Sequence, residues 1–89
     1  MSSQNRSDRL GKALVPGRAA PDPLRALLAQ NLVKFRMQAG LTQRALAARA
    51  GIRPRRIFEL EAGRSNATLD TINVVARALG VDPRELTRE

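Results

Sequence analysis

The sequence predicts an all-α fold on two observations. Apolar residues recur at the three- and four-residue spacing of a helix face on both sides of Gly51, where the pattern is interrupted. Most of the expected helices also carry start and stop signals, with Asp or Thr before the first turn and Gly after the last. We therefore expect five helices in one compact bundle, at residues near 23–39, 43–49, 54–62, 69–79 and 83–88.

Composition limits the size of the domain and the classes of site it can contain. A chain of 89 residues with 43% apolar content allows one small domain with one modest core. The absence of Cys and His excludes disulfides and the usual zinc or iron sites, so we expect neither a metal nor a cofactor. Two Phe, with no Trp or Tyr, argue against a stacking surface for single-stranded nucleic acid.

Charge is concentrated in the middle of the chain. Sixteen Lys and Arg against eight Asp and Glu give a formal charge of +8, which suits a polyanionic partner. Between Lys34 and Arg64 the chain has eight basic and two acidic residues, so this segment carries +6 of the total. The polyanion is therefore expected to bind there.

The N-terminal segment reads differently from the rest of the chain. Residues 1–21 are rich in Ser, Asn, Gly and Pro, and they keep no helical period, so we expect a flexible basic tail ahead of a folded domain at 22–89. The tail suits either an arm on DNA or a solvated leader. Because the segment lacks the apolar stretch of a secretory signal, and no apolar run reaches 18 residues, we expect a cytoplasmic protein without a membrane partner.

The expected core lies on the apolar faces of the first and fourth helices. In the first helix, which Asp22 and Pro23 begin, the apolar stripe comprises Leu24, Leu28, Leu32 and Phe35. In the fourth helix, the expected core positions are Leu69, Ile72, Val75, Ala76 and Leu79. Val81 and Leu86 either complete this core or form a small patch for a second subunit.

Residues 43–60 predict two short helices joined by a tight turn. Ala47 is small where a second helix must cross closely, and Gly51 can adopt the positive φ that a tight turn requires. Ile57 and Leu60 would seat the second helix on the core. The residues left on or near its other side are Pro54, Arg55, Arg56, Phe58 and Glu59. This arrangement is typical of a helix-turn-helix with a basic recognition helix.

At these residues the chain resembles a known family. The segments LTQRALAARAG, IRPRRIFELEAG and TLDTINVVARALGVD are similar to the Cro/C1-type (XRE, lambda-repressor-like) helix-turn-helix proteins, and the likeness runs from about Leu24 to Leu86. The resemblance implies a five-helix lambda-repressor-like domain. It also implies a sequence-specific regulator of transcription, a repressor or autorepressor, that reads the major groove of double-stranded DNA with its third helix.

The resemblance also implies roles for individual residues. Arg36 would pair with Glu61 near the end of the recognition helix, locking the first helix to it. Gln43, in the first turn of the second helix, would bind a backbone phosphate, although ordinary solvation is the alternative. The residues expected on phosphates are Gln43, Arg53, Arg64 and Asn66. For the loop after the recognition helix, a plain turn remains the competing interpretation.

Base readout is expected from the exposed side of the recognition helix. Because Pro54 has no donor, readout shifts to Arg55 and Glu59, with Arg56 next. Arg55 suits guanine N7 and O6, and Glu59 can accept from cytosine N4. Alternatively, Glu59 only holds Arg55 or Arg56 through an i,i+3 or i,i+4 pair. Phe58 would contact a thymine methyl or pack inward.

Two further functional classes compete with this one. The chain has no His or Cys and no phosphate-binding loop, so an enzyme is not expected. An antitoxin that binds a toxin protein and represses its own operon is the main alternative. For a regulator we expect a homodimer on a palindromic operator, weak without DNA. Its apolar contacts would come from Val74, Val81 and Leu86.

Overall fold

The computed structural model describes residues 22–89, in which all regular structure is helical. Its elements in order are the α-helices α2 (Pro23–Gln38), α3 (Gln43–Ala50), α4 (Pro54–Glu61) and α5 (Leu69–Leu79), and the 3-10 helix η1 (Pro83–Thr87). The prediction of an all-α fold is therefore confirmed. The last expected helix is a 3-10 helix rather than an α-helix, since Glu85 N–H donates to Asp82 O at 2.8 Å in the i→i+3 pattern. The expected tail, residues 1–21, lies outside the described residues.

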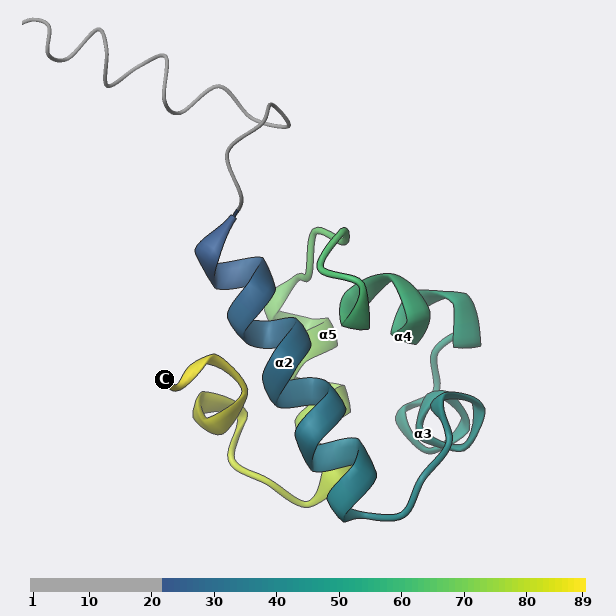
Figure 1. Cartoon of the computed structure of the whole chain (residues 1–89). Coiled ribbons are helices and arrows are strands. Elements are labelled where there is room, and N and C mark those ends of the chain that lie inside the picture. The colour runs from purple at the N-terminus through teal and green to yellow at the C-terminus, as the bar shows by residue number, and fades with distance from the viewer. Residues whose placement is uncertain (1–21) are drawn as a thin grey trace, which may run out of the picture.

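The helices form one bundle, in which α2 is the longest element (Figure 1). α2 contacts α4 on one side and η1 on the other, while α3 contacts both α4 and α5. In Figure 1, α5 passes behind α2, and the two helices α3 and α4 lie together on the side away from η1. The pair α3–α4 is thus attached to a scaffold made of α2, α5 and η1.

A single apolar core joins all five elements. Its fully or nearly fully buried members are Leu28, Leu32, Leu46, Ala47, Ile57, Leu60, Val75, Ala76 and Leu86. Leu86 is 0% exposed, so this residue completes the core and has no surface for a second subunit. Val81 is half-buried against the same cluster.

Two of the expected core residues are on the surface. Leu24 is 59% exposed and Leu69 is 78% exposed, so both assignments were wrong. Each residue has the right helical spacing but lies in the first turn of its helix. Spacing along one helix cannot show where the neighbouring elements end, and a core position at a terminus needs a neighbour to cover it.

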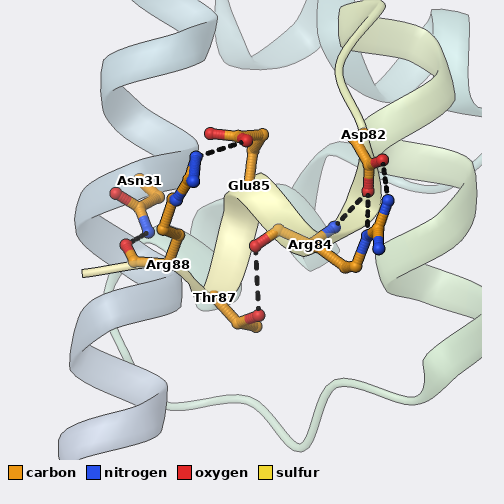
Figure 2. Close-up of polar contacts among 6 residues, drawn as sticks. All are labelled: Asn31, Asp82, Arg84, Glu85, Thr87 and Arg88. Atoms are coloured by element: carbon orange, nitrogen blue, oxygen red, sulfur yellow. Dashed lines mark hydrogen bonds and ion pairs between the residues drawn. The ribbon is translucent and has the colours of Figure 1, made fainter.

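The C-terminal turn is fixed by a buried polar residue that the sequence analysis did not identify. Asn31 of α2 is 7% exposed, and its Nδ2 donates to Leu86 O at 3.0 Å and Arg88 O at 2.9 Å. Figure 2 shows the second of these bonds beside the surface pairs Asp82–Arg84 and Glu85–Arg88. Because a buried amide needs partners, Asn31 specifies where η1 must lie on α2.

The turn between α3 and α4 depends on one glycine. Gly51 has φ of +74°, and its N–H donates to Ala48 O while that of Ile52 donates to Ala47 O. This double closure is a Schellman motif, which requires a left-handed residue at its corner. Ile52 then packs half-buried against the core, and Arg53 leads in extended backbone to Pro54.

Within residues 22–89, every helix is too short or too polar to cross a lipid bilayer.

Candidate nucleic-acid interface

The recognition helix α4 packs against the core through its apolar side. Ile57 is 0% exposed and Leu60 is 3% exposed, while the start of the helix has no side-chain cap because Arg53 occupies that position. Pro54 at the first helical position compensates in part, since its φ suits a helix and it has no N–H left unpaired. The opposite side of α4 does not pack against the core.

That opposite side carries three chemically different side chains. At about 100° per residue, Arg55 points almost directly away from Ile57 and Leu60, with Phe58 on one flank and Glu59 on the other. Arg55 Nε donates to Glu59 Oε2 at 3.1 Å, as the i,i+4 alternative expected. The Arg55 side chain is nevertheless 84% exposed, so the pair leaves its other donors open.

Phe58 faces outward. Its exposure is 53%, which decides against the inward packing that the sequence left open. It lines a shallow surface hollow together with Arg55, Glu59 and Arg64, the last from the loop that follows α4. A large apolar ring is therefore presented among charged groups on the outer side of the recognition helix.

The end of α4 is tied to α2 and α3 by a polar cluster around Glu61. Arg36 Nε donates to Glu61 Oε2 at 2.6 Å, and Arg36 Nη2 donates to Oε1 at 3.1 Å. The structure thus brings together the two residues that the resemblance paired, with side chains 17% and 6% exposed. Arg36 Nη1 also donates to Leu41 O at 2.8 Å, which fixes the turn before α3. One arginine therefore positions both helices of the motif.

Gln43 belongs to the same cluster. Its Nε2 donates to Glu61 Oε1 at 2.9 Å, a contact that was not foreseen. A primary amide has two N–H groups and a carbonyl oxygen, so one donor of Gln43 remains for another acceptor. The first turn of α3 is thus oriented from the end of α4, and the expected phosphate role of Gln43 would use the remaining donor.

Two arginines donate hydrogen bonds to the loop that follows α4. Arg56 Nη1 donates to Ser65 Oγ at 2.8 Å, and Arg56 Nη2 donates to Asn66 O at 3.0 Å. From the start of α2, Arg25 Nε donates to Ser65 O at 3.0 Å, and its Nη2 donates to Asn66 Oδ1. Both Nη atoms of Arg56 are thus engaged with the loop, so its geometry favours a structural role.

Arg25 is itself anchored at the surface. Its backbone N–H donates to Asp22 Oδ1 at 3.1 Å, and its guanidinium pairs with the other carboxylate oxygen. The hydrogen bond from the backbone N–H of Arg25 contributes most to lowering the pKa of Asp22 below its usual value, and the guanidinium of Arg25 lowers it further. The carboxylate thus remains charged and keeps Arg25 directed toward the loop.

The remaining residues expected on phosphates lie around the motif. Arg53 is exposed at the start of α4, and Arg64 is exposed in the hollow beside Phe58. Asn66 is exposed too, although its side-chain oxygen accepts from Arg25. The amide nitrogen of Asn66 is the group of that side chain that can donate to an anion.

Sequence reasoning missed Arg25 and Ser65. Ser65 is 7% exposed and accepts hydrogen bonds from both arginines that contact the loop. Its place between Arg64 and Asn66 in the sequence indicates only a turn. For Arg25 the local signal is Asp22 three residues before it, which predicts a surface pair and nothing across the fold. The residues of the loop that accept hydrogen bonds from Arg25 are about forty residues further along the chain.

Comparison with known proteins agrees with this geometry. The model of the family described as helix-turn-helix matches residues 32–86, a range that contains α3, the turn and α4 entire. The chain belongs to the helix-turn-helix family. The fold is that of the lambda-repressor-like domains of this family, as the resemblance implied.

Individual relatives are similar over most of their length. An uncharacterized HTH-type transcriptional regulator, y4dJ, of Sinorhizobium fredii is 40% identical over 63 residues, which are 71% of this chain and 82% of that protein. The crystal structure of the restriction-modification controller protein C.AhdI of Aeromonas hydrophila has 34% identity and a TM-score of 0.68, covering 70% of this chain and 94% of the other. The clp gene regulator ClgR of C. glutamicum has 31% identity and a TM-score of 0.71, covering 79% and 90%.

Proposed function

We propose that this protein is a transcriptional regulator that binds specific sequences of double-stranded DNA with α4 in the major groove. The observation that carries the proposal is the outer side of α4, where Arg55, Phe58 and Glu59 are free of the core. Ion pairing by Arg36 and Glu61 pre-orients that helix. The relatives described as regulators support the same function.

The two charged residues on this side suit a G·C pair. Arg55 has a planar fork that matches guanine N7 and O6, and Glu59 can accept from cytosine N4. In the free protein the two neutralise each other, and on DNA each would exchange this exposed contact for a base edge. Phosphates on either side of the contacted base pairs would be bound by Gln43, Arg53, Arg64 and Asn66. These contacts would fix the register of α4 on the duplex.

Selection of genomic DNA fragments by the purified protein, followed by footprinting, tests this proposal. At about 150 mM salt we expect enrichment of a few related sequences over random fragments. The matched control is the variant Arg55→Ala, which should enrich them less. Equal recovery of all fragments by the unaltered protein would contradict sequence-specific binding.

The phosphate contacts have a separate test in the salt dependence of binding. Each arginine that neutralises a phosphate contributes about 0.9 to the slope of log affinity against log salt. We expect Arg53→Ala and Arg64→Ala each to lower the slope by about that amount, and Gln43→Ala to weaken binding to all sequences alike. Arg88→Ala, at the exposed C-terminal end, is the control and should leave the slope unchanged.

We propose a weak homodimer that is completed on a palindromic operator. One recognition helix reads only a few base pairs, and a two-fold pair would place two helices ~34 Å apart along the duplex. Leu86 belongs to the core, so among residues 22–89 we place the contact at a hollow lined by Asn73, Arg77, Val81 and Pro83, next to the half-buried Val74 in the chain. Sedimentation with and without a palindromic duplex tests this, and a monomer bound one-to-one to its preferred site would contradict it.

We further propose that the regulation is negative. Repression requires only that the domain occupy its promoter, whereas activation requires a further contact with the transcription machinery. The reported regulators and the controller protein favour a regulator over the antitoxin alternative, which would need a toxin partner. A reporter gene behind the selected sequence should fall in expression when this protein is supplied. A rise would overturn the assignment of repression.

A further inference from the structure

The outer side of the recognition helix presents one large apolar side chain that is not part of the core. Phe58 is 53% exposed, whereas Ile57 and Leu60, the positions of α4 that face the core, are 0% and 3% exposed. Among residues 22–89, the other large apolar residues with high exposure are Leu24, Met37 and Leu69, which lie on α2 and α5. Phe58 is the large apolar side chain exposed on the described part of the motif α3–α4.

The surroundings of Phe58 indicate what kind of partner it fits. The hollow that it lines is otherwise formed by Arg55, Glu59 and Arg64, which are all charged. A protein partner is normally met by a contiguous apolar patch, and a single ring between ionised groups does not form one. The major groove of DNA instead combines hydrogen-bonding edges and phosphates with one apolar group, the C5-methyl of thymine.

We infer that Phe58 recognises a thymine C5-methyl beside the G·C pair contacted by Arg55, and that this makes the preferred site dependent on that methyl group. The inference rests on the proposed function and adds an element of specificity to it. Residues three apart on a helix have Cβ atoms about 5–6 Å apart, and base pairs are stacked about 3.4 Å apart. The thymine is therefore expected within two base pairs of the guanine.

Replacing thymine by uracil tests this inference, because the exchange removes the methyl group and leaves every hydrogen-bonding group in place. In the preferred duplex, each thymine is replaced in turn, and affinity is measured for each duplex. Burial of one methyl corresponds to about a fourfold change in affinity. We expect that loss at one thymine per half-site. In Phe58→Ala the thymine and uracil duplexes should bind equally at that position.

Two variants provide the controls. Leu69→Ala removes another exposed large apolar side chain, which lies outside the motif, and should keep the full response to uracil. Phe58→Leu keeps an apolar group and should keep part of the response. Since Phe58 is more than half exposed, the thermal midpoint of Phe58→Ala should stay close to that of the unaltered protein.

Each outcome decides the inference. A response to uracil that vanishes only in Phe58→Ala supports it. An equal response in Phe58→Ala assigns the methyl contact to another residue and overturns it, as does a preferred half-site that lacks thymine or is insensitive at every thymine. If selection yields no preferred sequence at all, the proposed function fails first, so the two failures are distinguishable.

Discussion

Arg36 and Glu61 form a two-pronged ion pair between α2 and α4, with Nε–Oε2 at 2.6 Å and Nη2–Oε1 at 3.1 Å. The carboxylate side chain is 6% exposed, so it depends on protein donors rather than on water. Its only other donor among the described hydrogen bonds is Gln43 Nε2. The orientation of the recognition helix relative to the scaffold therefore depends on one buried charge.

We expect Arg36→Met to destabilise the fold by about 3 kcal/mol, because it leaves the Glu61 carboxylate buried without its cation. The free energy of unfolding in urea measures this. Adding Glu61→Gln to Arg36→Met should recover part of the loss, since the unpaired charge is then removed. A loss below about 1 kcal/mol in the single variant would mean that water or another group replaces Arg36.

The second prediction concerns Asn31, which fixes the C-terminal turn. Asn31→Ala should lower the free energy of unfolding by about 1–3 kcal/mol, because two carbonyl groups lose their donor beside the core. Amide exchange should quicken in η1 before it does in α3 or α4. Asn73→Ala, on the exposed surface of α5, is the matched control and should change stability little.

Arg56 is predicted to act on stability rather than on sequence preference. Arg56→Ala removes the donors to Ser65 Oγ and Asn66 O, which should cost about 1 kcal/mol. A double-mutant cycle with Ser65→Ala measures the coupling of the two residues directly. If Arg56→Ala left stability unchanged but altered the preferred DNA sequence, Arg56 would be a base contact, as sequence reasoning first expected.

Arg55 is predicted to behave in the opposite way. Arg55→Ala should weaken binding to the preferred duplex by about 1–3 kcal/mol and relax preference at one base pair. Its side chain is 84% exposed and pairs only at the surface, so the unfolding transition should move little. Equal weakening on preferred and random DNA would identify Arg55 as a phosphate contact instead.

Asp82 at the start of η1 predicts a dependence on pH. The Arg84 side chain and backbone N–H donate to its carboxylate, which lowers the pKa of Asp82 from its usual value of 3.8 to about 2 (Figure 2). A carboxylate with a depressed pKa stabilises the fold above its unfolded pKa, and this contribution is lost as pH falls from about 4 through about 2.

We therefore expect Asp82→Asn to lower the thermal midpoint slightly near pH 7. Asn can still cap the helix, so the difference isolates the charge. The gap between the variant and the unaltered protein should narrow as pH falls below about 4. Thermal unfolding followed by circular dichroism between pH 7 and about 2 measures it, and a gap that is constant over this range would exclude the charge as its cause.

The helices and their order can be predicted from the sequence, because the signals for the helix ends are local. Asp22 Oδ1 accepts from the N–H of Leu24, Thr42 Oγ1 accepts from that of Ala45, and Thr68 Oγ1 accepts from that of Thr71. Each bond joins residues two or three apart, so the residue types at that spacing suffice to predict it. The same holds for Gly51, whose left-handed φ reverses the chain.

Which polar side chains of the motif stay exposed depends instead on the packing of distant segments. Arg55 and Arg56 are adjacent in the chain, yet Arg55 points outward while Arg56 clasps the loop. Asn31 is buried because the carbonyls of a turn 55 residues later lie within its reach. Whether a polar side chain is engaged or exposed depends on the donors and acceptors that distant segments bring to it. The spacing of residues within one helix gives no information about those segments.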